Sequence, residues 1–304
     1  MKDEKNSFLS LKQFDQEPVY QIKVKSTYNY EVLVNDVPVL VKYNDYMNDN
    51  FTEINSAILS AGTQQVAVKI FPKSRPDGTL LSKLEKDIPF RLSVERTEWT
   101  KAGDLAEPEA LVSYELPQAR GGAQIDYSTL SEFMDTLSFT ASVPYTLNGW
   151  QQSVDLRKMN REKLEADVVS FYKKLKDAFE TGDLDFYKKA IAPAELLVYQ
   201  ASYFTKDEAL AKSSTWYRFV EEKHGLEPLE PYTLQIFGSG RLVCLRGVNA
   251  PNKGEGVLRY LYKKNGMNRM LTYDLLLHQP AAGGDFEVIW FKHYDKNFFK
   301  GMAR

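Results

Sequence analysis

The histidines and the cysteine are the first side chains to weigh as carriers of chemistry, because metal binding and nucleophilic catalysis often depend on them. The chain of 304 residues contains three histidines, His224, His278 and His293, and a single cysteine, Cys244. None of the histidines stands at a metal-ligand spacing from the cysteine or from another histidine. Cys244 lies in an apolar stretch typical of a buried strand. We therefore expect no metal site, no intramolecular disulfide and no cysteine nucleophile.

Two short glycine motifs, at residues 238–240 and 254–256, are the only candidates for phosphate-binding loops. Each stands between two predicted strands, a position typical of a hairpin turn, whereas a phosphate-binding loop leads from a strand into a helix. No serine occupies a nucleophile-elbow motif. We therefore expect no cofactor, and no hydrolase of known pattern is indicated.

Asp274 and His278 could form an acid–base pair, because alternation places them on one face of a predicted strand. Tyr273, Leu275 and Leu277 occupy the other face, and this apolar set is the natural core side. Asp274 and His278 are thus predicted to lie outside that core. Four residues at roughly 3.3 Å each also separate them by about 13 Å, too far for a hydrogen-bonded dyad. We assign no catalytic residue.

Aromatic side chains on the predicted helices and strands of the second half could line a pocket. The candidates are Tyr172, Tyr199, Trp216, Tyr273 and Trp290. Aromatic residues at such spacings also pack in ordinary protein cores. The sequence leaves both interpretations open.

The elements that position these residues begin with two helices between residues 160 and 193. Apolar residues recur there every three or four positions, which keeps one stripe of a helix facing a core. Asn160 is a suitable N-cap, Gly182 can adopt the left-handed conformation that ends a helix, and Asp183 can cap a second helix that runs toward Pro193. The pattern predicts two helices that meet at a tight corner.

A third helix is predicted from Thr205, which forms a capping-box motif with Glu208, to His224, with Gly225 as its stop. The periodicity then changes to that of strands, with Asn265-Gly266 as a hairpin turn. The predicted strands cover residues 233–237, 241–248, 257–264, 269–278 and 286–291. Helices followed by long antiparallel strands indicate an α+β domain whose curved antiparallel sheet covers the helices.

The run FYKKLKDAFETGDLDFYKKAIAP, residues 171–193, resembles the opening of NTF2-like (SnoaL-like) domains. The helix and strands that follow continue in the expected order, so the resemblance covers roughly residues 158–292. It implies a cone-shaped domain with a pocket. It implies no single activity, because the superfamily includes isomerases, dehydratases, transport factors and plain association modules.

The N-terminal half is predicted to be nearly all strand, with turn formers such as Asn35-Asp36 between the strands. The predicted strands cover residues 20–25, 30–34, 37–43, 65–71, 90–99, 110–115 and 138–147. This spacing is typical of a β-sandwich. We therefore expect a sandwich-like domain over residues 1–150 and the α+β domain over residues 158–304.

Charge and hydropathy exclude several classes of function. Residues 1–152 carry 15 basic and 21 acidic side chains, and residues 153–304 carry 24 and 20, so neither half is basic enough to suggest nucleic acid. No apolar run approaches the length of a membrane span. The first residues do not form a secretory signal, so the chain as written is expected to be cytoplasmic. The alternative is the mature form of an exported periplasmic protein whose signal peptide is not in this chain.

Two functional hypotheses follow. The first is a non-enzymatic binding protein that engages another protein, such as a bacterial accessory or toxin-immunity protein, and the missing catalytic set favours it. The second is a small-molecule enzyme or carrier with an NTF2-like cavity, in which a buried carboxylate with a raised pKa acts as acid or base. A deep cavity lined by tyrosine and a desolvated Asp or Glu favours the second, and a cone filled by side chains favours the first.

Overall fold

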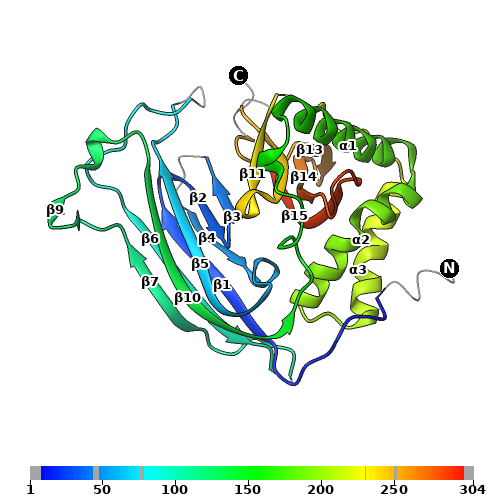
Figure 1. Cartoon of the computed structure of the whole chain (residues 1–304), viewed down its shortest axis with the longest axis horizontal. Coiled ribbons are helices and arrows are strands. Elements are labelled where there is room, and N and C mark those ends of the chain that lie inside the picture. The colour runs from blue at the N-terminus through cyan, green and yellow to red at the C-terminus, as the bar shows by residue number, and fades with distance from the viewer. Residues whose placement is uncertain are drawn as a thin grey trace. The chain divides into compact units, whose positions relative to one another are not determined.

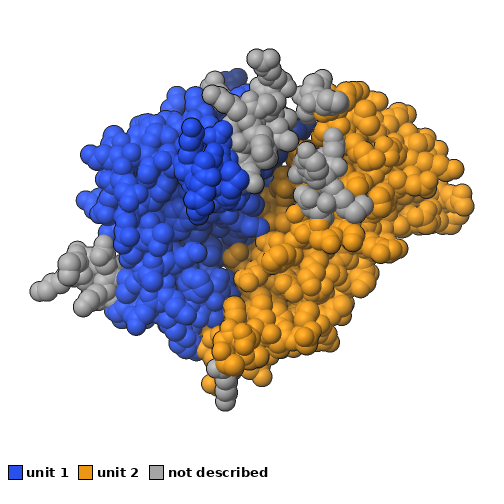
Figure 2. All heavy atoms as spheres, turned by 180° about the vertical axis from the view of Figure 1, so that it is seen from behind, with its two compact units in different colours: residues 1–13, 147–248, 252–303 blue, residues 14–146, 249–251, 304 orange. Residues whose placement is uncertain are grey.

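The computed structural model describes residues 8–43, 48–75, 79–100, 102–229, 231–249 and 252–297. The chain folds into antiparallel sheets and three helices and is rich in β-structure (Figure 1). Its contacts divide it into two compact units, coloured separately in Figure 2. Unit 1 comprises residues 1–13, 147–248 and 252–303, and unit 2 comprises residues 14–146, 249–251 and 304. The N-terminal segment thus belongs to unit 1 by its contacts, although the sequence pattern assigned it to the sandwich.

Unit 2 consists mainly of two four-stranded antiparallel sheets. The first has the order β4 (Asn48–Glu53), β1 (Pro18–Ser26), β6 (Phe90–Glu98), β7 (Glu109–Glu115), and the second has β10 (Phe133–Thr146), β5 (Ser60–Phe71), β2 (Asn29–Val34), β3 (Val37–Lys42). Rings from the two sheets meet, as in the pairs Tyr20–Phe139 and Tyr30–Phe90, each with centroids 5.8 Å apart. The sheets therefore pack face to face around an apolar core. The short strands β8 (Ala119–Arg120) and β9 (Ala123–Gln124) form a separate ribbon.

The predicted strands of unit 2 are confirmed, together with the turn at Asn35-Asp36, where both residues have positive φ angles. Strand β4 was not predicted. Its sequence, NDNFTE, does not alternate apolar and polar residues. The segment is an edge strand that pairs only with β1 within its sheet. Pairing with a neighbour, rather than burial of apolar side chains, makes this segment a strand.

Unit 1 contains the helices α1 (Arg161–Thr181), α2 (Leu184–Ala201) and α3 (Lys206–Glu221). Asn160 and Asp183 cap α1 and α2 through their side chains, and Gly182 ends α1 with a φ of 79°. Thr205 and Glu208 form the predicted capping box of α3. The helix starts are therefore set by local side-chain hydrogen bonds.

Two of the predicted helix ends are wrong. Helix α2 continues through Pro193 to Ala201, because residues beyond the proline, such as Ala194 and Leu197, bury a continuous apolar stripe. Helix α3 ends at Glu221, and Lys223, rather than Gly225, adopts the left-handed conformation, with a φ of 58°. Tertiary packing thus outweighs the local stop signals.

The sheet of unit 1 is antiparallel at every pairing described, with β14 at its centre. Its strands are β11 (Tyr232–Phe237), β12 (Leu242–Gly247), β13 (Leu258–Lys264), β14 (Met267–His278) and β15 (Glu287–Asn297). The predicted Asn265-Gly266 hairpin joins β13 to β14, with positive φ angles at both residues. Tyr273, Leu275 and Leu277 share one buried core with the apolar stripes of the helices. The predicted core face of β14 is confirmed.

Candidate functional site

Two of the five aromatic candidates, Trp216 and Tyr273, lie together in the core between helices and sheet. Their ring centroids are 5.2 Å apart, and Phe179 lies 4.9 Å from Tyr273. His293 stacks on Trp216 at 3.9 Å. Burial and the charge of Lys212 lower the pKa of His293 to about 3. The rings contact one another directly, as in a packed core.

Tyr172 belongs to the same core as Tyr273, whereas Tyr199 and Trp290 lie elsewhere in unit 1. Tyr199 belongs to a satellite cluster around Phe8. The ring centroid of Phe291 lies 6.4 Å from that of Tyr199 and 5.1 Å from that of His293, so Phe291 connects this cluster to the first group. Trp290 is buried, but its register opposite Leu276 places it on the face of the sheet turned away from Tyr273. The structure thus does not gather the five residues around one pocket.

Tyr172 on α1 fills a gap between β12 and β14. Val243 pairs with Leu277, and this register sets Leu245 opposite Leu275. The hydroxyl of Tyr172 accepts a hydrogen bond from the backbone nitrogen of Leu245 and donates one to the carbonyl of Leu275, both at 3.3 Å. It therefore replaces a direct bond between the two strands.

Replacing Tyr172 by phenylalanine should lower the free energy of unfolding by about 1–3 kcal/mol, because a buried N–H and a buried carbonyl lose their partner. Urea unfolding measures this change. Tyr262→Phe is the matched control, since that hydroxyl bonds to the carboxylate of Asp295 near the surface of the same sheet. An equal loss in both variants would contradict the bridging role of Tyr172.

Glu195 is a buried carboxyl group that the sequence did not single out. It is 3% exposed and accepts hydrogen bonds from Ser213 Oγ at 2.7 Å, Tyr217 OH at 2.8 Å and Tyr199 OH at 3.4 Å. Burial raises its pKa, although the three hydroxyl groups favour the ionised form. All of these donors belong to α2 and α3, so the cluster ties the two helices together.

Glu195→Ala should lower the free energy of unfolding by about 2–4 kcal/mol, because the buried hydroxyl groups lose their acceptor and a cavity forms. Glu195→Gln keeps an acceptor oxygen of the same shape and should cost much less. The comparison is made by urea unfolding, with the exposed Glu221→Ala as a control for loss of charge. Equal stability of the alanine and glutamine variants would show that the hydrogen bonds contribute nothing.

Asp274 and Arg246 form a buried ion pair on the face of the sheet opposite Tyr273. Their side chains are 2% and 1% exposed. Arg246 also donates to the carbonyl of Gly254, at 3.3 Å. The prediction that Asp274 lies outside the helix-side core is confirmed, but the residue is not exposed to solvent. Its charge is balanced by that of the buried arginine.

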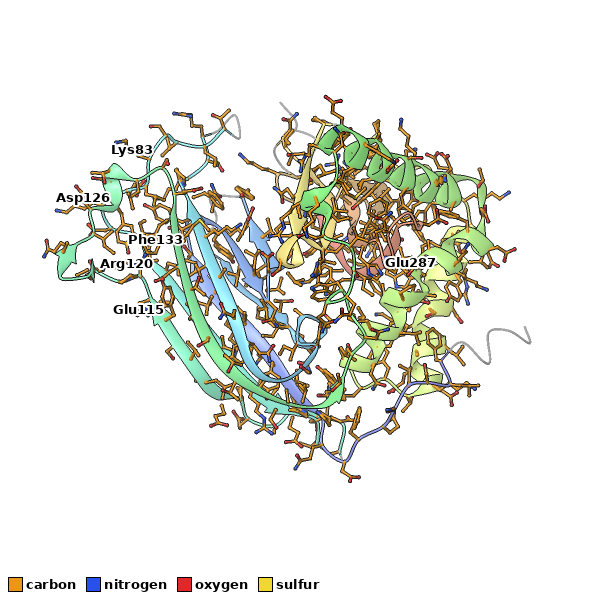
Figure 3. The ribbon with its side chains drawn as sticks, viewed as in Figure 1. Lys83, Glu115, Arg120, Asp126, Phe133 and Glu287 are labelled. Carbon is orange, nitrogen blue, oxygen red and sulfur yellow. The ribbon has the colours of Figure 1, made fainter. Side chains whose placement is uncertain are left out.

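His278 contacts Ser153 rather than Asp274. Its Nδ1 lies 2.7 Å from Ser153 Oγ, and its Nε2 lies 3.6 Å from Glu287, which is labelled in Figure 3. Burial lowers the pKa of His278 to about 4. Ser153 is itself buried, so this Ser–His–Glu arrangement offers no accessible nucleophile. It fixes the segment that precedes α1 onto the end of β14.

Unit 2 carries a hollow of about 530 Å³ on the outer face of its β4-β1-β6-β7 sheet. The outward side chains form two rows across the strands, which are Asp49–Lys25–Arg91–Glu115 and Phe51–Lys23–Ser93–Ser113. Figure 3 labels Glu115 at the end of β7. The two serines are small, whereas the side chains around them are long. This difference in length, on a twisted sheet, leaves the depression open.

The charged side chains of this face are arranged in pairs of opposite sign. Lys25 lies 3.7 Å from Asp49, and Arg91 lies 2.8 Å from Glu115. All four side chains are more than half exposed. Exposed pairs of this kind contribute little to folding. They are therefore free to exchange partners with a molecule that binds to the face.

Phe51 stands in the second row and is 69% exposed, the largest value among the exposed large hydrophobic side chains that the structure describes. Phe51 was not predicted as a surface residue of a sheet, because strand β4 was not predicted. An isolated phenylalanine in the polar run NDNFTE was the only available signal. We define the recognition face as the outward side chains of the two rows together with the hollow between them.

In the described ranges, no group of three or more His, Cys, Asp or Glu side chains could hold a metal ion. None of the helices in that part of the chain is long and apolar enough to cross a membrane. No protein-family model matches the chain, and no curated protein or solved structure matches it either.

Proposed function

We propose that the protein is a non-enzymatic binding protein whose recognition face engages another protein. The observation that carries this proposal is the hollow of about 530 Å³ that Phe51 and paired charges line on a sheet face of unit 2. Aromatic and arginine side chains are enriched in protein interfaces and among the residues that contribute most to affinity. Phe51 and Arg91 are accordingly the anchors that we assign to the partner.

A protein partner fits this face better than a small molecule does. Small-molecule pockets enclose most of the surface of their ligand. The hollow instead lies open on the face of a sheet, and its border includes Lys23, Lys25, Arg91, Asp49 and Glu115, with charges of both signs. Such a mixture suits a protein surface with complementary charges, which gives specificity and rapid association. A bacterial accessory or toxin-immunity protein would act through a face of this kind.

We also infer that unit 1 is an NTF2-like module that serves association rather than catalysis. Its three helices share a core with an antiparallel sheet, as the resemblance implies. The enzyme or carrier alternative would use Glu195 as its desolvated carboxylate. Glu195, however, is engaged by three hydroxyl groups of its own helices, and the aromatic rings nearby pack on one another. These contacts support a filled cone.

Site-specific photo-crosslinking tests the proposed face. A photoreactive residue at Ser113, which lines the hollow, should form a crosslink to one partner in cells that express the protein naturally. The matched control places the same residue at Met134, an exposed position on the other sheet of unit 2. A crosslink from position 113 but not 134 supports the proposal. Identical products from both positions, or none from position 113, would overturn it.

A further inference from the structure

Residues 8–13 of the N-terminal segment pack on unit 1 and begin with a turn, in which the Leu11 nitrogen donates a hydrogen bond to the Phe8 carbonyl at 3.3 Å. We use the term groove for the apolar surface of unit 1 that they cover, which includes Tyr199, Phe204 and Leu210. Phe8 is 2% exposed and meets the ring of Tyr199 edge-on, with centroids 5.5 Å apart. Tyr199 in turn stacks on Phe204 at 5.3 Å. Figure 1 shows the segment in blue beside α3. Phe8 therefore fills an aromatic pocket formed by the end of α2 and the turn into α3.

The groove also recognises the backbone of the segment. Gln200 on α2 accepts a hydrogen bond from the Lys12 nitrogen at 2.7 Å and donates one to the Lys12 carbonyl at 2.9 Å. Gln13 donates from its side chain to the Phe204 carbonyl at 3.1 Å. A side-chain amide that pairs with both polar groups of one residue binds main chain, whatever side chain that residue carries.

The turn directs the side chains of its first and fourth residues toward the groove and leaves the two residues between them exposed. Phe8 and Leu11 pack on the satellite cluster, which also includes Ala209 of α3. Leu9, between them, is 64% exposed. The groove thus selects two apolar residues three positions apart and ignores the residue that follows the first. This pattern is typical of short-peptide recognition, with anchors in pockets and hydrogen bonds to the backbone.

Apart from Phe8 and Leu11, the satellite cluster consists of residues of α2, α3, β15 and the turn between the two helices. The main core of unit 1 is a separate cluster that does not contain Phe8. The segment belongs to no described helix or strand of unit 1. Its covalent attachment raises its effective concentration at the groove but adds no contact that a free peptide would lack.

We propose that this groove is a peptide-binding site for a partner segment of the form Phe-x-x-Leu, and that the chain's own residues 8–13 compete for it. The inference goes beyond the recognition face, which lies in unit 2 and shares no residue with the groove. Binding of a partner segment requires release of Phe8, so the N-terminal segment sets the threshold for that interaction.

A fluorescent peptide with the sequence of residues 7–15, SFLSLKQFD, tests the proposal by titration with the full-length chain. The Phe8→Ala chain should bind it at least about tenfold more tightly than the unchanged chain, because the internal competitor loses its anchor. Leu9→Ala is the matched control and should change nothing. A peptide with alanine in place of its first phenylalanine should not bind.

A second variant tests the same competition without truncating a buried side chain, for the case that the Phe8→Ala chain does not fold. Lys12→Pro leaves Phe8 in place but removes the N–H that donates to Gln200, and it should shift the peptide affinity in the same direction by a smaller factor. The Phe51→Ala chain should bind the peptide with the same affinity as the unchanged chain. A result against the proposed role of the recognition face is therefore distinguishable from a result against the peptide-binding site. Equal peptide affinity in the unchanged, Phe8→Ala and Lys12→Pro chains would overturn the proposal. Exchange of the segment between two copies, seen as a concentration-dependent dimer, would also overturn it.

Discussion

Replacing Asp274 by alanine is expected to lower the free energy of unfolding by about 3–5 kcal/mol, among the largest effects of any single substitution in this chain. The carboxylate is the buried counter-charge of Arg246, whose side chain is 1% exposed. Its removal leaves a guanidinium in a site from which water is excluded. The loss is measured by urea or thermal unfolding of the full-length protein.

The double variant Arg246→Met, Asp274→Leu separates the cost of the unpaired charge from the worth of the pair. Removing both charges should restore much of the stability that Asp274→Ala loses, because buried ion pairs are close to neutral against apolar replacements. Asp295→Ala is the surface control, since its partner Arg269 lies near solvent, and it should cost less than about 1 kcal/mol. A small loss in Asp274→Ala would show that Arg246 finds another partner.

The second large effect is acid lability caused by His278. Burial lowers its pKa to about 4 in the folded chain, against an ordinary value of 6.5, even though Glu287 lies 3.6 Å from Nε2. The unfolded chain therefore binds a proton at a higher pH than the folded chain does. The stability that the neutral imidazole contributes is present above pH 6.5 and is lost as the pH falls toward 4. The loss is on the order of 3 kcal/mol.

Unfolding by urea at intervals between pH 7 and 4 measures this slope. His278→Gln should make it less steep, because glutamine cannot take up a proton yet can still hydrogen-bond to Ser153. The slope that remains includes the contribution of His293, whose pKa burial and Lys212 lower to about 3. The difference between the two curves isolates His278 from His293 and Glu195. Parallel curves for the unchanged and His278→Gln chains would contradict this assignment.

The elements of the fold were largely predictable because their signals are local. Asn160, Gly182 and the Thr205–Glu208 pair set helix ends by hydrogen bonds within one turn, and Asn265-Gly266 set a hairpin. The signals that failed were those that tertiary contacts outweigh. Pro193 lies inside a helix because the residues on both sides of it bury one stripe.

The recognition face was not predictable, for a related physical reason. Strand β4 exists because β1 offers it hydrogen-bonding partners, and its polar sequence carries no periodic signal. Without β4, Phe51 reads as an isolated aromatic residue in a loop. The buried partners of Asp274 and Glu195 were equally hidden, since Arg246 and Ser213 are 28 and 18 residues away in sequence. Only the register of strands and the packing of helices bring these pairs together.

We propose that the outer face of the β4-β1-β6-β7 sheet binds a protein partner. The decisive measurement is the dissociation constant of the partner captured at position 113, determined with purified unchanged, Phe51→Ala and Met134→Ala chains. Phe51→Ala should weaken binding at least about tenfold, because an exposed aromatic anchor in a hollow carries much of the affinity. Met134→Ala should leave it within about twofold, as expected for an exposed residue outside the interface. Equal dissociation constants for the unchanged and Phe51→Ala chains would contradict the claim.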